Sequence, residues 1–372
     1  DVLSESTDAI RLIEYVDISA VSPGCISTDL ESMTFKQAPS RARRLARPGD
    51  VIVATVRTYL RAIARVDEDR ASCVFSTGFA ILRPCPSTCD SRYLTYVMTS
   101  EGVMDEIVAT STGVSYPAIN PSALMRLRIP VHDLSTQQRI ADYLDRETGE
   151  IDAMLAKLDE MESVLRERVH TIQDAALYVP EARATPIWSL FAEEKRQNHP
   201  TETILSVYRD LGVIRKDSRD DNFNRTPEDV SAYQLVNPGD LVVNKMKAWQ
   251  GSLGISPERG IVSPDYSVSK PIHPHDGRFL HRLLRSQRMV PEYRIRSKGV
   301  RPAQWRLYWQ DLAQVKLPIP ETVEQVRIAD HLDAVTDRID LMLAKVDQLK
   351  ALLIERRAAL ITDVVTGRKE VA

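Results

Sequence analysis

The 372-residue sequence has no long apolar run and no strong excess of either charge. No stretch approaches the roughly 18 to 20 apolar residues that span a bilayer, and residues 1–4 lack the basic and apolar regions of a signal peptide. We therefore expect a cytoplasmic protein with no membrane partner. The 49 basic and 52 acidic residues leave a net charge of −3, so any binding of nucleic acid must depend on local basic patches.

Cysteine is scarce, and signatures of catalysis are absent. Zinc sites need clustered thiolates, but among Cys25, Cys73, Cys85 and Cys89 only the last two are close, and no second pair matches them. The sequence also has no phosphate-binding loop, no dinucleotide-binding glycine fingerprint, no zinc-protease motif and no nucleophile elbow. We therefore expect reduced thiols, no metal site, no catalytic residue and no cofactor bound by this chain itself.

An internal repeat is the most informative feature that is present. The sequence from Arg139, RIADYLDRETGEIDAMLAKLDEMESVLRER, returns from Arg327 as RIADHLDAVTDRIDLMLAKVDQLKALLIER, with more than half of the positions identical and no gap. Upstream, a Pro-Gly-Asp turn precedes a β-branched run in both halves, VIVATV after Asp50 and LVVNKM after Asp240. The pattern indicates two copies of one module, each an α+β globular part followed by a long helix.

Start and stop signals bound the two helices. Capping-box spacing predicts that they start at Ser135 with Gln138 and at Thr322 with Gln325, and stop signals follow at Pro180 and Gly367. In a capping box, the hydroxyl and the amide satisfy free backbone N–H groups of the first turn.

Apolar residues recur at every seventh position of both helices. They are Leu144, Ile151, Leu158, Leu165 and Ile172 in the first helix, and Leu332, Ile339, Val346, Leu353 and Leu360 in the second. Met154, Met161, Met342 and Leu349 are expected at the intermediate seam positions. Such a seam over about four heptads predicts a coiled coil, in which the two helices would form a spacer of roughly 40 Å. The alternative is that each helix is buried separately in its own module.

Basic side chains are concentrated in the globular parts, where they are candidates for binding DNA. The planar fork of arginine can bond a phosphate or the O6 and N7 edge of guanine, and asparagine and glutamine can pair with adenine. The candidates are Arg41, Arg43, Arg44, Arg47, Arg57 and Arg61 in the first module, and Asn244, Lys245, Lys247, Trp249, Arg294, Arg296, Lys298, Arg301 and Gln304 in the second. For each charged residue, a plain surface salt bridge is the competing interpretation. A spacer of roughly 40 Å is near the half-site separation of dimeric DNA readers, about 34 to 36 Å.

These features resemble the specificity subunits of type I restriction-modification systems. The resemblance rests on LRIPVHDLSTQQRIADYLD and VKLPIPETVEQVRIADHLD at the starts of the helices, on the two Pro-Gly-Asp segments, and on LSESTDAIRLIEYVDISAVSPG near the N-terminus. It implies an α+β fold with two target-recognition domains, residues 1–134 and 181–321, separated by two long helices, residues 135–180 and 322–372. The helices would form an antiparallel coiled coil, and the internal repeat would have pseudo-twofold symmetry.

The resemblance also implies a division of labour. Each target-recognition domain would bind one half of an asymmetric, bipartite site in double-stranded DNA. The chain would be non-catalytic and would dock two DNA methyltransferase subunits and, where present, restriction subunits that act as motor-nucleases. S-adenosylmethionine, ATP and Mg²⁺ would be bound by those partners. The alternative function is a non-catalytic coiled-coil scaffold whose globular ends bind proteins.

One departure from the family pattern concerns the first module. The second module opens with ATPIWSL from Ala184, the first has no counterpart, and the sequence does not begin with Met. We therefore expect either that the N-terminus was trimmed or that the first domain is abbreviated.

Overall fold

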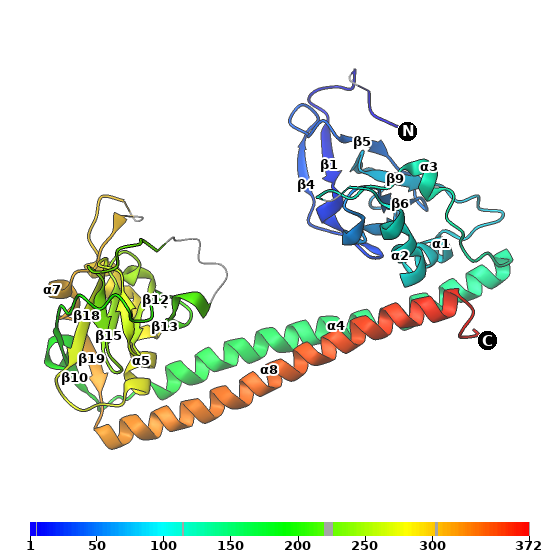
Figure 1. The fold of residues 1–372 in the computed structure, drawn as a ribbon. Helices are drawn as coiled ribbons and strands as arrows, with labels where there is room; N and C mark the ends of the chain where they lie inside the picture. The colour runs from blue at the N-terminus through cyan, green and yellow to red at the C-terminus, as the bar shows by residue number, and fades with distance from the viewer. Residues whose placement is uncertain (5, 114, 219–225, 302–303, 372) are drawn as a thin grey trace. The chain divides into compact units, whose positions relative to one another are not determined.

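The computed structural model describes residues 1–371 apart from residues 5, 114, 219–225 and 302–303. The chain forms two compact units (Figure 1). Unit 1 comprises Asp1–Glu160 and Val346–Ala372, and unit 2 comprises Met161–Lys345. Each unit therefore contains one end of both long helices, α4 (Leu134–Ala176) and α8 (Thr322–Val365).

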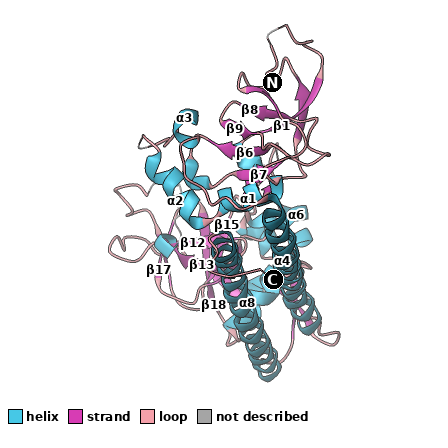
Figure 2. Cartoon of the chain, turned by 90° about the vertical axis from the view of Figure 1, so that its right-hand side faces the viewer, coloured by secondary structure: helices cyan, strands magenta, loops and turns pink. Residues whose placement is uncertain are grey.

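Unit 1 contains two principal sheets and three short helices. One sheet has the order β4-β1-β8-β5, and the other has the order β7-β6-β9. The strands are β1 (Leu12–Val16), β2 (Val21–Ser22), β3 (Cys25–Ile26), β4 (Glu31–Thr34), β5 (Ala42–Leu45), β6 (Val51–Ala54), β7 (Ile63–Arg65), β8 (Val74–Ser76) and β9 (Phe79–Leu82); the helices are α1 (Ser91–Thr99), α2 (Glu101–Thr110) and α3 (Pro121–Leu124). β6 is buried along its whole length, as its continuous apolar run predicts, and α1 packs against β6 and β7 (Figure 2).

Unit 2 repeats this plan with an additional strand in its central sheet. That sheet has the order β11-β18-β15-β16, and its pairs are antiparallel. The strands are β10 (Arg183–Pro186), β11 (Phe191–Glu193), β12 (Leu205–Tyr208), β13 (Gly212–Arg215), β14 (Gln234–Val236), β15 (Leu241–Asn244), β16 (Leu253–Ile255), β17 (Gly260–Val262), β18 (Tyr266–Pro271) and β19 (Lys316–Ile319); the helices are α5 (Gly277–Arg285), α6 (Val290–Arg296) and α7 (Trp309–Leu312).

The two central sheets correspond strand by strand. β6 and β15 each follow a Pro-Gly-Asp turn, and β9 and β18 each pair with that strand on one side while β7 and β16 pair with it on the other. β11 and β10 have no counterpart among the described strands of unit 1. This difference matches the ATPIWSL segment that the sequence comparison finds in the second module alone.

Within each unit, the two long helices pack against each other and run in opposite directions. In unit 1, Leu144 near the start of α4 shares a core with Ile361 and Val364 near the end of α8. In unit 2, Ile172 near the end of α4 packs against a core that contains Leu332 near the start of α8. The antiparallel coiled coil and the α+β fold class are therefore confirmed, and the alternative of two helices buried separately is excluded.

The coiled-coil seam differs from the expected one in its intermediate positions. The residues at every seventh position are buried or half-buried, as for Leu144 (0% exposed) and Ile339 (4%). The expected intermediate positions are wrong: Met154, Met161, Met342 and Leu349 are 48%, 44%, 36% and 46% exposed. The second buried or half-buried position instead comes four residues after each seam residue, at Thr148 and Leu155 in α4 and at Leu343 and Lys350 in α8. Two of these four residues, Thr148 and Lys350, are polar, which weakened the sequence signal.

The capping boxes are also wrong, because Asp133 and not Ser135 caps the first helix, and the Gln325 amide bonds outside the second helix. Asp133 caps α4: its carboxylate accepts hydrogen bonds from the backbone N–H of Thr136 and from the Ser135 hydroxyl. Gln325 bonds to the N–H of Asp276 and the carbonyl of Pro320. Gly367, with φ +74°, does follow the end of α8 as predicted.

Candidate nucleic-acid interface

In each unit, the strand after the Pro-Gly-Asp turn leads into a tight turn at one end of the central sheet. We call residues 55–61 tip 1 and residues 245–251 tip 2. A second segment is bonded to each tip in the same way: the N–H of Ile119 donates to the carbonyl of Thr55 at 2.8 Å, and the N–H of Leu307 donates to the carbonyl of Lys245 at 2.9 Å. The structure therefore brings residues 112–113 and 115–118 beside tip 1 and residues 298–301 and 304–306 beside tip 2.

The Pro-Gly-Asp aspartates have a structural role at the start of these strands. Asp50 is 2% exposed and accepts two hydrogen bonds from Arg83, at 2.8 and 2.7 Å. Burial acts to raise the pKa of Asp50, but the bonds from Arg83 and the Arg47 backbone outweigh it and hold the pKa below its ordinary value. Asp240 is equally buried and bonds to Arg196, but here burial prevails and raises the pKa.

Tip 1 is a single 3₁₀ turn, η2 (Thr58–Leu60), between two arginines with left-handed backbones. Arg57 has φ +52° and Arg61 has φ +54°, a region that non-glycine residues rarely occupy. Thr58 is buried and its hydroxyl bonds to that of Ser111 at 2.8 Å. The Arg57 guanidinium lies 4.9 Å from the centre of the Tyr116 ring. Tip 1 therefore combines a fixed backbone with exposed basic and aromatic groups.

Tip 2 has its 3₁₀ turn at the same distance from the strand, but Lys247 before the turn has φ −122° where Arg57 is left-handed, and the side chains differ. Its 3₁₀ turn, η5 (Ala248–Gln250), ends at Gly251, which has φ +92°. The rings of Trp249 and Trp305 meet edge to face, with centroids 5.6 Å apart. Lys245 donates to the carbonyl of Pro264 at 2.9 Å, whereas Lys247 is exposed. The sequence candidates Lys245, Lys247 and Trp249 therefore come together.

The segment beside tip 2 carries several of the remaining candidates. Lys298 pairs with Arg306 through the backbone, and its ammonium group is 2.6 Å from Asp311. Arg301 and Gln304 are exposed. In α6, Arg296 bonds to Glu292 at 2.6 Å, and Arg294 is exposed. Salt bridges therefore already engage Lys298 and Arg296, whereas no described salt bridge engages the exposed Arg294 and Arg301.

Asn244 does not lie on the surface with the other candidates. It is 8% exposed, and its side-chain oxygen accepts a hydrogen bond from the N–H of Met246 at 3.1 Å. The side chain therefore shapes tip 2 from inside and has little area with which to contact a base.

The arginines in β5 and at its two ends, Arg41, Arg43, Arg44 and Arg47, are distributed along the direction of that strand. Arg41 lies at the end of β5 that is nearer to tip 1. Its carbonyl accepts a hydrogen bond from the N–H of Thr77, and the next residue, Gly78, accepts one from Thr55 of tip 1. The Nε of Arg41 donates to the Tyr15 hydroxyl at 3.1 Å. Arg47 lies at the other end, beside Asp50. Arg41 and Arg47 are close in sequence but therefore do not belong to one basic surface patch.

Arg43 and Arg44 lie between these two arginines. The Arg43 guanidinium lies 4.6 Å from the centre of the Phe35 ring. Arg44 is half-buried, and its Nε has no hydrogen-bond partner within the described part of the chain.

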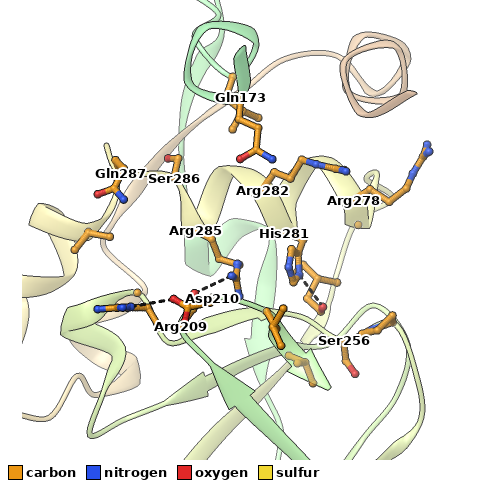
Figure 3. A pocket seen from close by; sticks show the side chains of 18 of the residues that line it. Gln173, Arg209, Asp210, Ser256, Arg278, His281, Arg282, Arg285, Ser286 and Gln287 are labelled. Carbon is orange, nitrogen blue, oxygen red and sulfur yellow. Dashed lines mark hydrogen bonds and ion pairs between the residues drawn. The ribbon is translucent and has the colours of Figure 1, made fainter. Parts of the chain in front are cut away.

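A groove of about 1660 Å³ in unit 2 was not predicted from the sequence. Its walls are α4, α5 and the β12–β13 hairpin, and it extends to Trp249 and Arg294 (Figure 3). Arg285 donates to the carbonyls of Tyr208 and Arg209, which holds the hairpin against α5. The lining comes from segments far apart in sequence, so no local signal could have revealed it.

Burial and the neighbouring Arg285 lower the pKa of His281 to about 4. The described residues include no group of three or more side chains suited to a metal ion. No helix in the described ranges is long and apolar enough to span a bilayer.

Comparisons with known proteins agree with this architecture. The chain aligns with a chain from a study of complex assembly and conformational transition in a type I restriction-modification system, with a TM-score of 0.71, 20% identity, and coverage of 96% and 92% of the two chains. It also aligns with the HsdS subunit of Thermoanaerobacter tengcongensis, with a TM-score of 0.54, 21% identity, and coverage of 97% and 92%. The chain therefore has the fold of type I specificity subunits.

A sequence relative points in the same direction. The chain is 24% identical over 116 residues to the type I restriction enzyme HindI specificity subunit of Haemophilus influenzae, a match that covers 31% of this chain and 25% of that protein. The match thus spans about a quarter of the length of that curated relative. No protein-family model matches the chain. The expected resemblance to type I specificity subunits is confirmed in both sequence and fold.

Proposed function

We propose that this chain is the DNA-reading specificity subunit of a type I restriction-modification complex. The observation that carries the proposal is the duplicated tip, since a single 3₁₀ turn begins four residues after the end of the corresponding strand in both units. Arg57 and Tyr116 occupy one tip, whereas Lys247, Trp249 and Trp305 occupy the other. Two readers with different side chains recognise an asymmetric, two-part DNA site.

The chain would act without catalysing a reaction itself. Two methyltransferase subunits would supply S-adenosylmethionine and the methyl-transfer chemistry, and restriction subunits, where present, would use ATP and Mg²⁺. The exposed apolar residues of the long helices support a docking role. They include Met154, Leu349, Leu352 and Ile354 in unit 1, and Met161, Val164, Leu341 and Met342 in unit 2. Apolar patches of this kind are typical of protein interfaces.

A genome-wide methylation map, recorded in the source cell with and without the gene, tests this function. We expect adenine methylation to disappear at one asymmetric, two-part motif when the gene is removed. A strain in which the chain carries both Arg57→Ala and Lys247→Ala tests whether this methylation depends on the two tips. An unchanged map in an otherwise active system would contradict the proposal.

A protein-binding scaffold is the second candidate, favoured by the exposed apolar residues of the helices alone. DNA binding separates the two functions. A reader that neutralises phosphates releases counterions, so its affinity falls steeply as salt rises. Absent or salt-insensitive DNA binding, with the methyltransferase subunits supplied, would favour the scaffold.

A further inference from the structure

Tip 1 holds two adjacent apolar side chains out into solvent. Tyr59 is 53% exposed and Leu60 is 43% exposed, and both belong to η2. Thr58, the third residue of this turn, is 2% exposed and anchors it to Ser111. The turn therefore buries its polar residue and presents its large apolar ones.

The backbone around these side chains is strained on both sides. Arg57 and Arg61 are left-handed, whereas the residue equivalent to Arg61 in tip 2 is Gly251, which adopts this region without steric cost. An arginine at position 61 therefore carries a conformational cost that glycine avoids. Strain of this kind persists where surrounding structure holds it and is concentrated at functional sites.

The local contacts of Arg61 do not account for this cost. Its guanidinium is 3.4 Å from Asp105, and the two side chains are 43% and 74% exposed. An ion pair so open to water contributes little stability. The guanidinium is instead free to turn toward a ligand next to Tyr59 and Leu60, and Arg57 lies on the other side of the pair.

We infer that Tyr59 and Leu60 form an apolar wedge that enters the base stack of DNA, with Arg57 and Arg61 on the adjoining phosphates. This inference rests on the proposed function and deepens it. Apolar side chains inserted between base steps partly unstack them, and the sequence-dependent cost of unstacking contributes to specificity. Tip 1 has the required parts in order: a cation, an aromatic ring, an aliphatic side chain and a second cation.

The wedge is held ready by backbone hydrogen bonds. The N–H of Leu60 donates to the carbonyl of Arg57 at 2.9 Å, and the N–H of Arg61 donates to the carbonyl of Thr58 at 3.0 Å. The N–H of Arg57 donates to the carbonyl of Pro117 at 2.7 Å. A turn already fixed in shape loses little entropy when it binds.

The test begins with in vitro selection from a pool of randomised duplex DNA by the full chain assembled with its methyltransferase subunits. The enriched duplex is then labelled with the fluorescent adenine analogue 2-aminopurine at successive steps of the half-site read by unit 1. We expect one step to brighten on binding of the wild-type complex. Leu60→Ala and Tyr59→Ala should each lose that signal and weaken binding about tenfold or more, with an unchanged salt slope.

Two matched variants separate this role from a structural one. Met125→Ala removes another exposed apolar side chain of unit 1, which is 73% exposed, and should leave both binding and fluorescence unchanged. Arg61→Gly should raise thermal stability, because the strain is relieved, while it weakens DNA binding and reduces the salt slope.

The outcomes distinguish the inference from the proposed function. If the wild-type complex selects a duplex but Leu60→Ala and Tyr59→Ala bind it with equal affinity and equal fluorescence, the wedge is wrong and the DNA-reading function stands. If the wild-type complex enriches no sequence, the DNA-reading function fails, and the wedge fails with it.

Discussion

The side-chain oxygen of Gln137 accepts a hydrogen bond from the backbone N–H of Asp90 at 2.9 Å. Its amide nitrogen donates to the carbonyls of Thr88 and His132, at 3.0 and 2.8 Å. Gln325 accepts from the N–H of Asp276 in the same way at 3.0 Å. A buried amide thus joins the first helix of each globular part to the start of the long helix that follows it.

Replacing Gln137 with alanine should lower the free energy of unfolding of unit 1 by about 1 to 3 kcal/mol, because buried polar groups lose their partners. Gln138→Ala is the control, since Gln138 is exposed beside it. Hydrogen exchange of β6 and α1 amides would report the change. Equal loss in both variants would instead support a capping box.

The stability contributed by Asp50 should depend on pH. Its folded pKa is lowered, so its contribution is present above the unfolded pKa of about 3.9 and is lost as pH falls through the folded value. The difference between wild type and Asp50→Asn should therefore be largest near neutral pH and shrink in acid. Hydrogen exchange of unit 1 measured at several pH values checks this.

Asp240→Asn is the matched comparison and should behave differently. Burial raises the folded pKa of Asp240, so its contribution is present below the unfolded pKa and is lost as pH rises through the folded value. At neutral pH this variant should cost less stability than Asp50→Asn. All four tryptophans lie in unit 2, at Trp188, Trp249, Trp305 and Trp309, so tryptophan fluorescence follows its unfolding. An equal cost at neutral pH would contradict the assignment.

Gly212→Ala should destabilise unit 2 more than Gly24→Ala destabilises unit 1. Both glycines have positive φ, +77° and +83°, so each substitution carries a backbone cost of about 1 to 2 kcal/mol. A Cβ at Gly212 would also lie 2.4 Å from the half-buried His281 ring, whereas at Gly24 the nearest atom is 3.6 Å away. Denaturant unfolding curves, with hydrogen exchange for unit 1, measure the two losses. Similar losses would show that the hairpin moves away from α5.

Under the proposed function, Lys247→Ala and Arg57→Ala should each reduce the slope of log affinity against log salt by about one, because each would remove one proposed phosphate contact. Arg47→Ala should leave the slope unchanged, since Arg47 lies at the other end of β5 beside Asp50. The measurement is DNA binding by the assembled complex at a series of salt concentrations. A slope reduced only by Arg47→Ala would move the interface away from the tips.

Seven residues inserted into each long helix, where the two units meet in sequence, should widen the unread gap in the DNA site. The insertion lengthens each helix by about 10 Å, which corresponds to about three base pairs. Methylation mapping should show the same half-sites further apart. New half-sites would indicate that the helices themselves read bases.

The repeat and the heptad seam made the helices and their pairing predictable from sequence. The details failed where a side chain acts over a long sequence distance. Gln325 has the spacing of a capping residue but bonds to Asp276, which is 49 positions away. Met154 has the spacing of an intermediate seam residue yet is exposed. Thr148 and Leu155 are at the intermediate positions of the seam instead.

The candidate site was predictable only in part. Lys245, Lys247 and Trp249 are adjacent in sequence and come together at tip 2. Arg41 and Arg47 belong to one sequence run but lie at opposite ends of β5. Asn244 has suitable chemistry but is buried by the fold. Tyr59 and Leu60 carry no charge, and their exposure depends on how Thr58 is anchored by Ser111.

The core of unit 1 contains Val51 and Leu144 together with Ile361 and Val364, so it is assembled from both halves of the polypeptide. During synthesis, the early residues of this core leave the ribosome long before their late partners. A prematurely terminated chain would therefore expose an incomplete first core to chaperones and proteases. If the proposed function holds, a truncated chain that could bind only half of a DNA site would therefore also lack a complete first core.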